Sequence, residues 1–227
     1  SIRQQHDELN NLLLLREMPI CATRDDNEGV AVRFVKVACG AAHTLLVSEG
    51  GEVYGCGLDR WMQLGHSVNW HNGSSFQTRL RRINNLHDSC LLPGEEVIQV
   101  ACGADHSMCL TSHGNVYTWG LHKNGQLGRR LRTKYGEPMI VKGLPRKEQQ
   151  GTKRGGDSER SVVIQEIASG KEHCVALDSR GELWGWGRNN YGQLGRDNER
   201  IVWQPMRIAA PAEKGHNHCT LLISLVE

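Results

Sequence analysis

The sequence predicts an all-β protein built from a repeated unit, and three observations support this prediction. A Gly-x-x-His motif recurs with a period of about 65 residues, ending at His43, His106 and His173. A glycine turn and an aromatic-glycine step follow each histidine, and each copy then closes on Gln-Leu-Gly. A short unit repeated at a fixed period cannot bury its apolar face alone, so successive units stack on one another. The repetition therefore indicates one continuous architecture along the chain.

Within the second copy, the pattern is that of a β-hairpin. Larger and smaller side chains alternate over residues 106–111, which is the period of two typical of a strand with unlike faces. Gly114 and Asn115 then supply a turn, and residues 116–120 form the predicted returning strand. Glycine suits such a turn because it reaches positive φ without the steric penalty that a Cβ brings. The matching turns of the other two copies contain Gly50, Gly51 and Gly181.

Two further strands complete each predicted unit. An apolar run precedes every Gly-x-x-His motif and forms the first strand. After Gln-Leu-Gly, the second and third copies share a spaced apolar pattern that opens on Pro138 and Pro205. We predict that this pattern is the fourth strand and that the proline stands at its start, where a missing N–H does least harm. The first copy has a looser version, formed by Leu80, Ile83 and Leu86. Each unit thus contains about four short strands, and four-stranded sheets repeated around an axis make a β-propeller.

These motifs resemble the repeat of the RCC1 (regulator of chromosome condensation) family. Residues 100–128 match almost every position of that repeat, whereas the third copy departs at Ser169 and the first has Cys56 in place of tryptophan. The resemblance covers about residues 37–211. It implies an RCC1-like β-propeller with three complete four-stranded blades plus the start of a fourth, as part of a seven-bladed ring. It also implies structural roles for Gly40, His43, Gly57, Gly65, Gly103, His106, Trp119, Gly120, Gly128, Gly170, His173, Trp186, Gly187, Gly195, Gly215 and His218.

The repeats divide the chain into three parts. Residues 1–36 are predicted to form a short helix and then a lead-in strand, and the helix either packs against the ring or binds a partner. Residues 37–211 hold the three repeats, and residues 212–227 begin a fourth. Residues 146–160 are charged and lack apolar periodicity, which predicts an exposed loop. Because an open half-ring leaves raw sheet edges, we expect a larger chain, or a ring completed by another polypeptide.

The composition argues against a membrane-spanning helix and against a disulfide-linked protein. The formal net charge is +2, and no apolar run approaches the roughly 20 residues that span a bilayer. Cys39 and Cys102 take the place that Ser169 holds in the third copy, so the eight cysteines indicate small buried sites rather than disulfides. We therefore expect an intracellular, reducing compartment, the cytoplasm or nucleus. The excess of arginine over lysine leaves the mitochondrion open.

No catalytic constellation is visible, and we predict no catalytic residue and no cofactor. The sequence lacks Gly-x-Ser-x-Gly, a Walker loop and His-Glu-x-x-His. The recurring histidines would lie a blade width apart, far beyond metal-ligand distances of about 2 Å. Each is therefore predicted to be a buried hydrogen-bonding residue that ties together the strands of its own blade. The local cluster of His216, His218 and Cys219 is the one alternative metal site.

The predicted function is that of a non-catalytic protein-interaction scaffold, a subunit or module of a larger assembly. The resemblance leaves two alternatives: guanine nucleotide exchange on a small GTPase of the Ran type, and an organelle-specific assembly factor. Partner specificity is expected in the segments that differ between the copies. These segments contain aromatic residues close to arginines, a mixture typical of interfaces. Their arginine-rich runs at residues 79–82 and 129–132 also leave nucleic acid open as a ligand. The candidate partner-binding residues are Trp70, Arg79, Arg81, Arg82, Arg129, Arg130 and Arg132.

Overall fold

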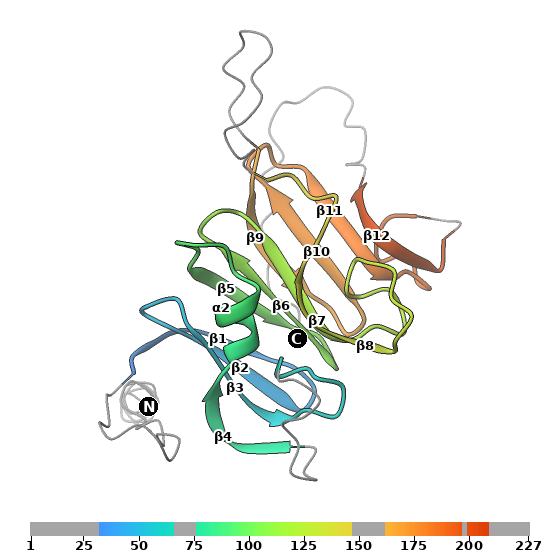
Figure 1. The fold of residues 1–227 in the computed structure, drawn as a ribbon. Helices are drawn as coiled ribbons and strands as arrows, with labels where there is room; N and C mark the ends of the chain where they lie inside the picture. Colours follow the sequence, from blue (N-terminus) through green and yellow to red (C-terminus); the bar gives the residue numbers. More distant parts are fainter. Residues whose placement is uncertain (1–31, 66–75, 147–161, 197–198, 209–227) are drawn as a thin grey trace, which may run out of the picture.

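A computed structural model describes residues 32–65, 76–146, 162–196 and 199–208, which form three four-stranded antiparallel sheets and one short helix (Figure 1). This confirms the predicted all-β repeat. The first sheet comprises β1 (Phe34–Cys39), β2 (His43–Ser48), β3 (Val53–Leu58) and β4 (Phe76–Arg82). The second comprises β5 (Val97–Cys102), β6 (His106–Thr111), β7 (Val116–Leu121) and β8 (Tyr135–Ile140). The third comprises β9 (Ile164–Ser169), β10 (His173–Asp178), β11 (Leu183–Arg188) and β12 (Ile201–Ile208). The helix α2 (Asn84–Ser89) lies between the first two sheets in the chain.

Each sheet is an up-and-down meander, and the three share one register. The recurring histidine begins the second strand and lies opposite the glycine of the aromatic-glycine step, as His106 does with Gly120. Gly120 has a φ of 99°, and a Cβ at this position would also press against the backbone of the turn before His106. Both the backbone conformation and the close approach therefore require glycine. The equivalent glycines, Gly57 and Gly187, have φ of 104° and 102°.

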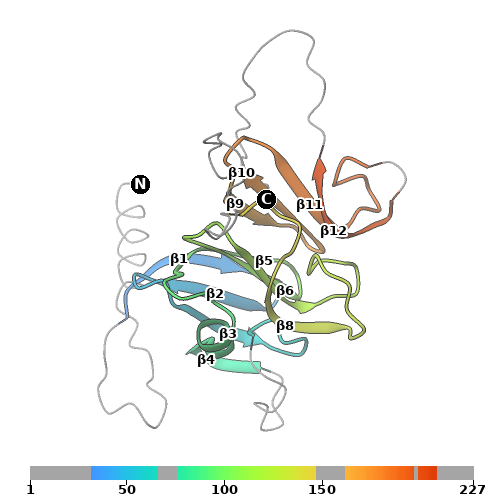
Figure 2. The same ribbon diagram turned by 45° about the horizontal axis from the view of Figure 1, so that its top comes forward.

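The three sheets stand side by side with their first strands closest together (Figure 2). β1 contacts β5 and β5 contacts β9, whereas β4, β8 and β12 form the outer edges of their sheets. Each sheet is therefore one blade of a propeller. We call them blade one, blade two and blade three in chain order.

The hydrophobic core lies between the blades rather than within them. One buried cluster joins Leu45 and Val47 of blade one to Val100 and Trp119 of blade two. A second cluster repeats this arrangement between blades two and three. We call the face of a blade that is directed toward the next blade its trailing face, and the opposite face its leading face.

Burial at a repeated position depends on the neighbouring blade. Val100 and Ile167 hold equivalent places on the leading faces of blades two and three, and they are 6% and 3% exposed. Val37 holds the same place on blade one and is 64% exposed, since no described residue covers that leading face. The open face of blade one therefore carries an apolar side chain that its counterparts bury.

The fourth strand differs from the prediction in two respects. Pro138 and Pro205 lie inside β8 and β12 rather than at their starts. Both strands are outermost in their sheets, and the pairing register shifts close to each proline, so the missing N–H interrupts little of the ladder. In the first copy the strand ends before Ile83, and Leu86 is buried in α2 instead.

Several predicted segments lie outside the described residues: the N-terminal helix, most of the loop at residues 146–160, Trp70, and the start of the fourth repeat with Gly215 and His218. β1 begins at Phe34, ahead of the repeat boundary predicted at residue 37. Within the described ranges, no helix is long and apolar enough to cross a lipid bilayer.

Candidate functional site

The recurring histidine joins neighbouring blades. His43 Nε2 lies 2.9 Å from the hydroxyl oxygen of Ser107, which belongs to blade two. His106 repeats the arrangement against blade three, where its Nε2 lies 3.1 Å from Cys174 Sγ and 2.9 Å from Ser169 Oγ. For His43 and His106, the prediction that the imidazole ties together the strands of its own blade is therefore wrong. Both side chains leave their own sheet to reach the next one.

The direction of the imidazole hydrogen bond follows from a second acceptor. Ser107 Oγ donates to the main-chain oxygen of Gln63, 2.7 Å away. This bond uses the single hydroxyl hydrogen, so the Nε2 of His43 must carry the hydrogen that it shares with Ser107. Trp119 Nε1 donates to the same Gln63 oxygen from 2.9 Å. The hydroxyl and the indole of blade two therefore hold the Gln-Leu-Gly turn of blade one.

The joint between blades two and three has the same design, with a thiol in place of the hydroxyl. Cys174 Sγ donates to the main-chain oxygen of Gln126 over 3.3 Å, and Trp186 Nε1 donates to it over 2.9 Å. A main-chain bond lies beside them, from Ala104 N–H to the oxygen of Lys171 at 3.0 Å. The recurring histidine, tryptophan and Gln-Leu-Gly are therefore parts of one inter-blade joint.

The glycine of Gly-x-x-His leaves room for the imidazole. A Cβ placed on Gly40, Gly103 or Gly170 would collide with the histidine ring three residues later. None of these glycines has a positive φ, so close packing rather than backbone conformation excludes a larger residue. The glycines of Gln-Leu-Gly do have positive φ, at 71°, 64° and 65° for Gly65, Gly128 and Gly195.

Burial keeps the joint histidines neutral. Desolvation lowers the pKa of His43 to about 4 and that of His106 to about 3, and it also lowers the pKa of His173. A neutral ring with its hydrogen on Nε2 is the donor that the joint uses. Among the residues that the structure describes, no group of three or more His, Cys, Asp and Glu side chains is placed to hold a metal ion.

A hollow of about 310 Å³ opens where the three Gly-x-x-His turns meet. Its wall consists of short side chains and main chain, apart from one lysine. Burial raises the pKa of the Cys102 thiol to about 12, so this thiol stays protonated and is a poor nucleophile. The lining residues of the hollow are Cys39, Gly40, Ala41, Cys102, Gly103, Ala104, Ser169, Gly170 and Lys171.

Two of the candidate partner-binding arginines are engaged within the chain. Arg82 forms ion pairs with Glu52 at 2.6 Å and with Asp88 at 3.1 Å. Arg129 donates to the main-chain oxygen and the hydroxyl of Thr118, at 3.1 and 2.9 Å, and to the main-chain oxygen of Glu137 at 2.8 Å. Burial lowers the pKa of Arg129 to about 10. Both side chains therefore have a role within their own blade, and the partner contact predicted for them stays a prediction.

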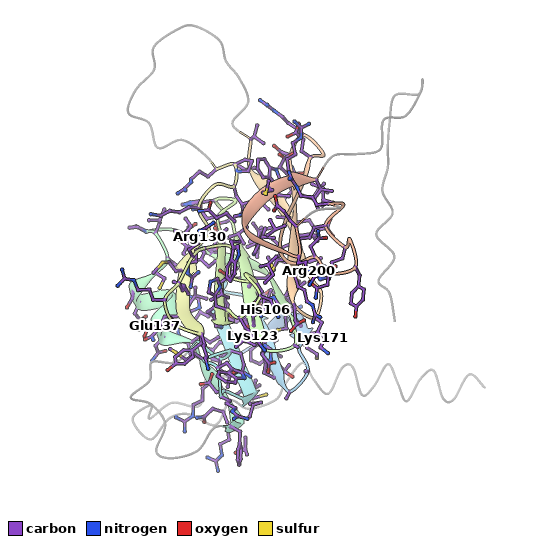
Figure 3. The ribbon with its side chains drawn as sticks, turned by 90° about the vertical axis from the view of Figure 1, so that its right-hand side faces the viewer. His106, Lys123, Arg130, Glu137, Lys171 and Arg200 are labelled. Carbon is purple, nitrogen blue, oxygen red and sulfur yellow. The ribbon has the colours of Figure 1, made fainter. Side chains whose placement is uncertain are left out.

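The other candidate arginines differ from these two. Arg130 and Arg132 are exposed although they follow Arg129 directly in the chain, and Figure 3 shows Arg130 toward the outside of the molecule while His106 lies within it. On β4, Arg79 is exposed and Arg81 is half-buried. Partner binding by these four residues and by Trp70 stays a prediction.

Sequence reasoning missed a set of residues in the loop after the third strand of each blade. Trp61, Asn124 and Tyr191 occupy one position, just ahead of each Gln-Leu-Gly. The guanidinium of Arg60 lies 5.3 Å from the Trp61 ring centroid, and Tyr191 is 87% exposed. Asn124 donates to the carboxylate of Glu172 on the next blade at 2.9 Å. An alignment of the three copies would have revealed this position, because it varies inside an otherwise constant motif.

The same end of the blades carries exposed cations. The Gly-x-x-His turn with Lys171 lies at this end because each recurring histidine pairs with the last part of the third strand. Arg200 is also there, since its main-chain oxygen accepts from the N–H of Asn189 at 2.8 Å. No ion pair with another described residue engages these cations or the exposed Arg60 and Lys123. We call the resulting set the loop rim: Arg60, Trp61, Lys123, Lys171, Tyr191 and Arg200.

Family models match the repeats found in the chain. One model, described as the regulator of chromosome condensation (RCC1) repeat, matches residues 34–60, 97–126 and 164–193. A second model of the same description matches residues 50–110, 113–177 and 180–222. The matches cover all three blades and extend past β12.

Individual proteins with similar sequence or structure belong to the same group. The chain is 32% identical over 188 residues to Protein RCC2 homolog of Xenopus laevis, covering 76% of this chain and 33% of that one. It is 33% identical over 162 residues to the human RCC1-like G exchanging factor-like protein, covering 71% and 30%. The crystal structure of human WBSCR16 superposes with a TM-score of 0.61 at 27% identity, covering 82% and 42%. The chain thus spans about a third of the length of these curated relatives.

Proposed function

This chain belongs to the family of proteins built from regulator of chromosome condensation (RCC1) repeats, and from that premise we propose that it is a non-catalytic module that binds other proteins. One observation supports this function most directly. Residues common to the three copies form the inter-blade joints, whereas residues that differ between copies form the loop rim. A rigid scaffold with variable exposed loops is the arrangement by which such folds present binding surfaces.

The loop rim favours a protein partner whose contact surface is acidic. Its four cations, Arg60, Lys123, Lys171 and Arg200, are all exposed. The acids at the same end offset them little: Asp59 is buried, Asp105 is half-buried, Glu172 is paired with Arg188, and Glu199 is paired with Arg196. Trp61 and Tyr191 add aromatic surface among these charges, and such a mixture is typical of interface hot spots. Complementary charge would steer the partner and set its orientation.

Charge reversal at the rim tests this function. The variant Arg60→Glu with Lys171→Glu should reduce recovery of native partners by about tenfold or more in quantitative affinity purification. The matched control reverses Lys142 and Arg180, which are exposed in turns at the opposite end of the blades. Equal recovery with both double variants would show that the rim is not the binding surface.

A second candidate function is guanine nucleotide exchange on a small GTPase. It is favoured by the similarity of the chain to the human RCC1-like G exchanging factor-like protein, at 33% identity. The match covers 30% of that protein, so an exchange surface could belong to parts without a counterpart among these residues. We rank this function below protein binding because no described residue is assigned to such a surface.

We also propose a reducing compartment. All six cysteines of the described ranges are free thiols, and Cys109 and Cys174 are buried among the blades. A disulfide found at either of these two residues in protein isolated under thiol-blocking conditions would contradict this assignment.

A further inference from the structure

The loop between β7 and β8 carries an exposed threonine, Thr133, within a basic stretch of the chain. Its neighbours are Arg129, Arg130 and Arg132 before it and Lys134 after it. No other exposed serine or threonine of the described ranges has an arginine among the four residues that precede it. These other exposed hydroxyl residues are Thr78, Ser89, Ser112 and Ser179. The hydroxyl of Thr133 therefore differs from the rest in the charge around it.

The backbone and the side chains around Thr133 are accessible. Residues 130–134 belong to no helix or strand, and Arg130, Arg132 and Lys134 are exposed together with Thr133. The Thr133 hydroxyl donates to the main-chain oxygen of Tyr135 at 2.6 Å, and this bond lies at the surface. No ion pair with another described residue engages Arg130, Arg132 or Lys134. Their charges can therefore act on an incoming enzyme or on a phosphate.

An exposed hydroxyl that follows an arginine by three residues is a substrate pattern of arginine-directed protein kinases, which read the charge around the acceptor. Arg130 holds this position relative to Thr133. We propose that Thr133 is a phosphorylation site for such a kinase and that its phosphate weakens partner binding at the loop rim. In the reaction, Thr133 Oγ1 bonds to the γ-phosphorus of ATP while the bond to the ADP oxygen breaks. The hydroxyl proton passes to the catalytic aspartate of the kinase.

The chain holds the modified residue close to the loop rim. Tyr135, which accepts the Thr133 hydroxyl, lies with its ring centroid 6.4 Å from that of Trp61 in the loop rim. The main-chain oxygen of Lys134 accepts from the N–H of His122 at 2.7 Å, directly before Lys123 of the loop rim. The loop of Thr133 and the loop rim therefore occupy the same end of the blades.

Phosphorylation changes both a hydrogen bond and the local charge. The reaction removes the hydrogen that Thr133 donates to Tyr135, and the phosphate oxygens are strong acceptors that repel this carbonyl. The side chain therefore turns toward Arg130, Arg132 and Lys134, which are the donors beside it in the chain. The phosphate brings a charge of about −2 at neutral pH.

The effect on binding rests on the proposed function, in which four exposed cations of the loop rim attract an acidic partner. A phosphate at the same end of the blades offsets part of that positive charge. It also repels an acidic surface directly, and like charges brought together at an interface lower affinity. Phosphorylation of Thr133 is therefore expected to release the partner.

Phosphorylation of the full chain by a purified kinase tests the site. The folded chain is incubated with magnesium, ATP and a kinase that selects arginine three residues before the acceptor, and phosphate at each hydroxyl is quantified by peptide mass spectrometry. We expect Thr133 to be labelled at least about tenfold faster than Ser112, an exposed turn residue without a preceding arginine. Arg130→Ala should slow the labelling of Thr133 by about tenfold. Lys142→Ala, which removes an exposed cation at the opposite end, should leave it unchanged.

A synthetic peptide of residues 127–139 separates the sequence from the fold. If the kinase labels the peptide but not the folded chain, the structure shields Thr133 and the proposal is overturned. Absence of label from both overturns it as well, because the sequence is then not a substrate. Equal labelling of Thr133 and Ser112 in the folded chain shows that the arginines direct nothing, which also overturns it.

Partner recovery tests the consequence of the modification. The phosphorylated chain should recover about fivefold less native partner than the chain incubated without ATP, in quantitative affinity purification. Thr133→Val, carried through the same kinase treatment, should recover as much as the chain without ATP. Equal recovery with and without phosphate on Thr133 overturns the regulatory role. Failure of the proposed function itself looks different, because Arg60→Glu with Lys171→Glu then recovers partners undiminished while the labelling of Thr133 is measured independently.

Discussion

The indole Nε1 of Trp119 lies 2.9 Å from the main-chain oxygen of Gln63, so a tryptophan of blade two holds the closing turn of blade one. Trp186 and Gln126 repeat the contact at 2.9 Å one blade further on. The most recognisable residues of the repeat therefore act between units.

Removing the indole donor should destabilise the joint. Trp119→Phe keeps an aromatic ring in the core but loses the bond to Gln63 and leaves a small void. We expect the free energy of unfolding to fall by about 2–3 kcal/mol, measured by urea denaturation. Trp61→Phe is the control, because its indole makes no hydrogen bond to a described residue. Equal losses from the two variants would contradict a special role for the Trp119 contact.

Filling the space beside the joint histidine should also be destabilising. In Gly103→Val, the new side chain would collide with the His106 ring, and we expect a loss of about 2–4 kcal/mol from strain and overpacking. Gly50→Ala is the comparison, since a Cβ there meets nothing nearer than the Ser48 hydroxyl at 4.0 Å. An unchanged melting temperature for Gly103→Val would refute the close-packing argument.

Acid should weaken the joints before it protonates most carboxylates. Burial lowers the folded-state pKa of His43 to about 4 and that of His106 to about 3, below the unfolded value of about 6.5. Between the folded-state and unfolded-state pKa values, the unfolded chain therefore binds more protons than the folded chain. Stability is full above about pH 6.5 and falls as the pH drops toward these folded values, by up to about 1.4 kcal/mol per pH unit for each histidine.

Urea titrations between pH 7.5 and 5 measure this slope. His106→Gln should reduce it, because one titrating group is lost. Ser169→Ala removes a hydroxyl that lies 2.9 Å from His106 Nε2, so it weakens the same joint without removing a titrating group and should keep the slope while lowering stability throughout. A slope in His106→Gln as steep as in the unaltered chain would show that the histidine is not the source.

Removing the Arg129 side chain should destabilise the protein more than removing that of Arg130 or Arg132. Arg129→Ala removes the donors to Thr118 and Glu137, and we expect a loss of about 2–3 kcal/mol because their acceptors lose partners in a partly buried site. Arg130→Ala and Arg132→Ala should change stability by less than about 0.5 kcal/mol, as exposed positions do. Chemical denaturation of the three variants makes the comparison. Similar losses in all three would contradict the division between structural and exposed arginines.

The proposed binding function predicts no nucleotide exchange by this chain alone. Release of a fluorescent GDP analogue from a panel of small GTPases should proceed at the spontaneous rate when the chain is added. An RCC1-family exchange factor with demonstrated activity serves as the positive control. Stimulation of about tenfold or more for any GTPase would place exchange above scaffolding.

Much of the fold follows from the sequence because its signals are local. The alternation around His106, the turn at Gly114 and the return to Gly120 concern residues that pair within one hairpin, so their spacing predicts the pairing. The prolines of the outer strands were misplaced for the opposite reason. Pro138 is tolerated inside β8 because no described strand pairs beyond it, and edge position is a property of the whole sheet.

The partners of the repeated side chains come only from the tertiary arrangement. The sequence shows that a histidine recurs at the position of His106 in each copy. It does not show that the His106 ring lies against Cys174 on another blade. Likewise Val37 and Val100 occupy one position of the repeat, yet one is 64% exposed and the other 6%. Hairpin pairing depends on residues a few places apart, whereas burial and long-range hydrogen bonds depend on which blade stands alongside. Local spacing therefore encodes each blade, and the contact between blades decides what its side chains do.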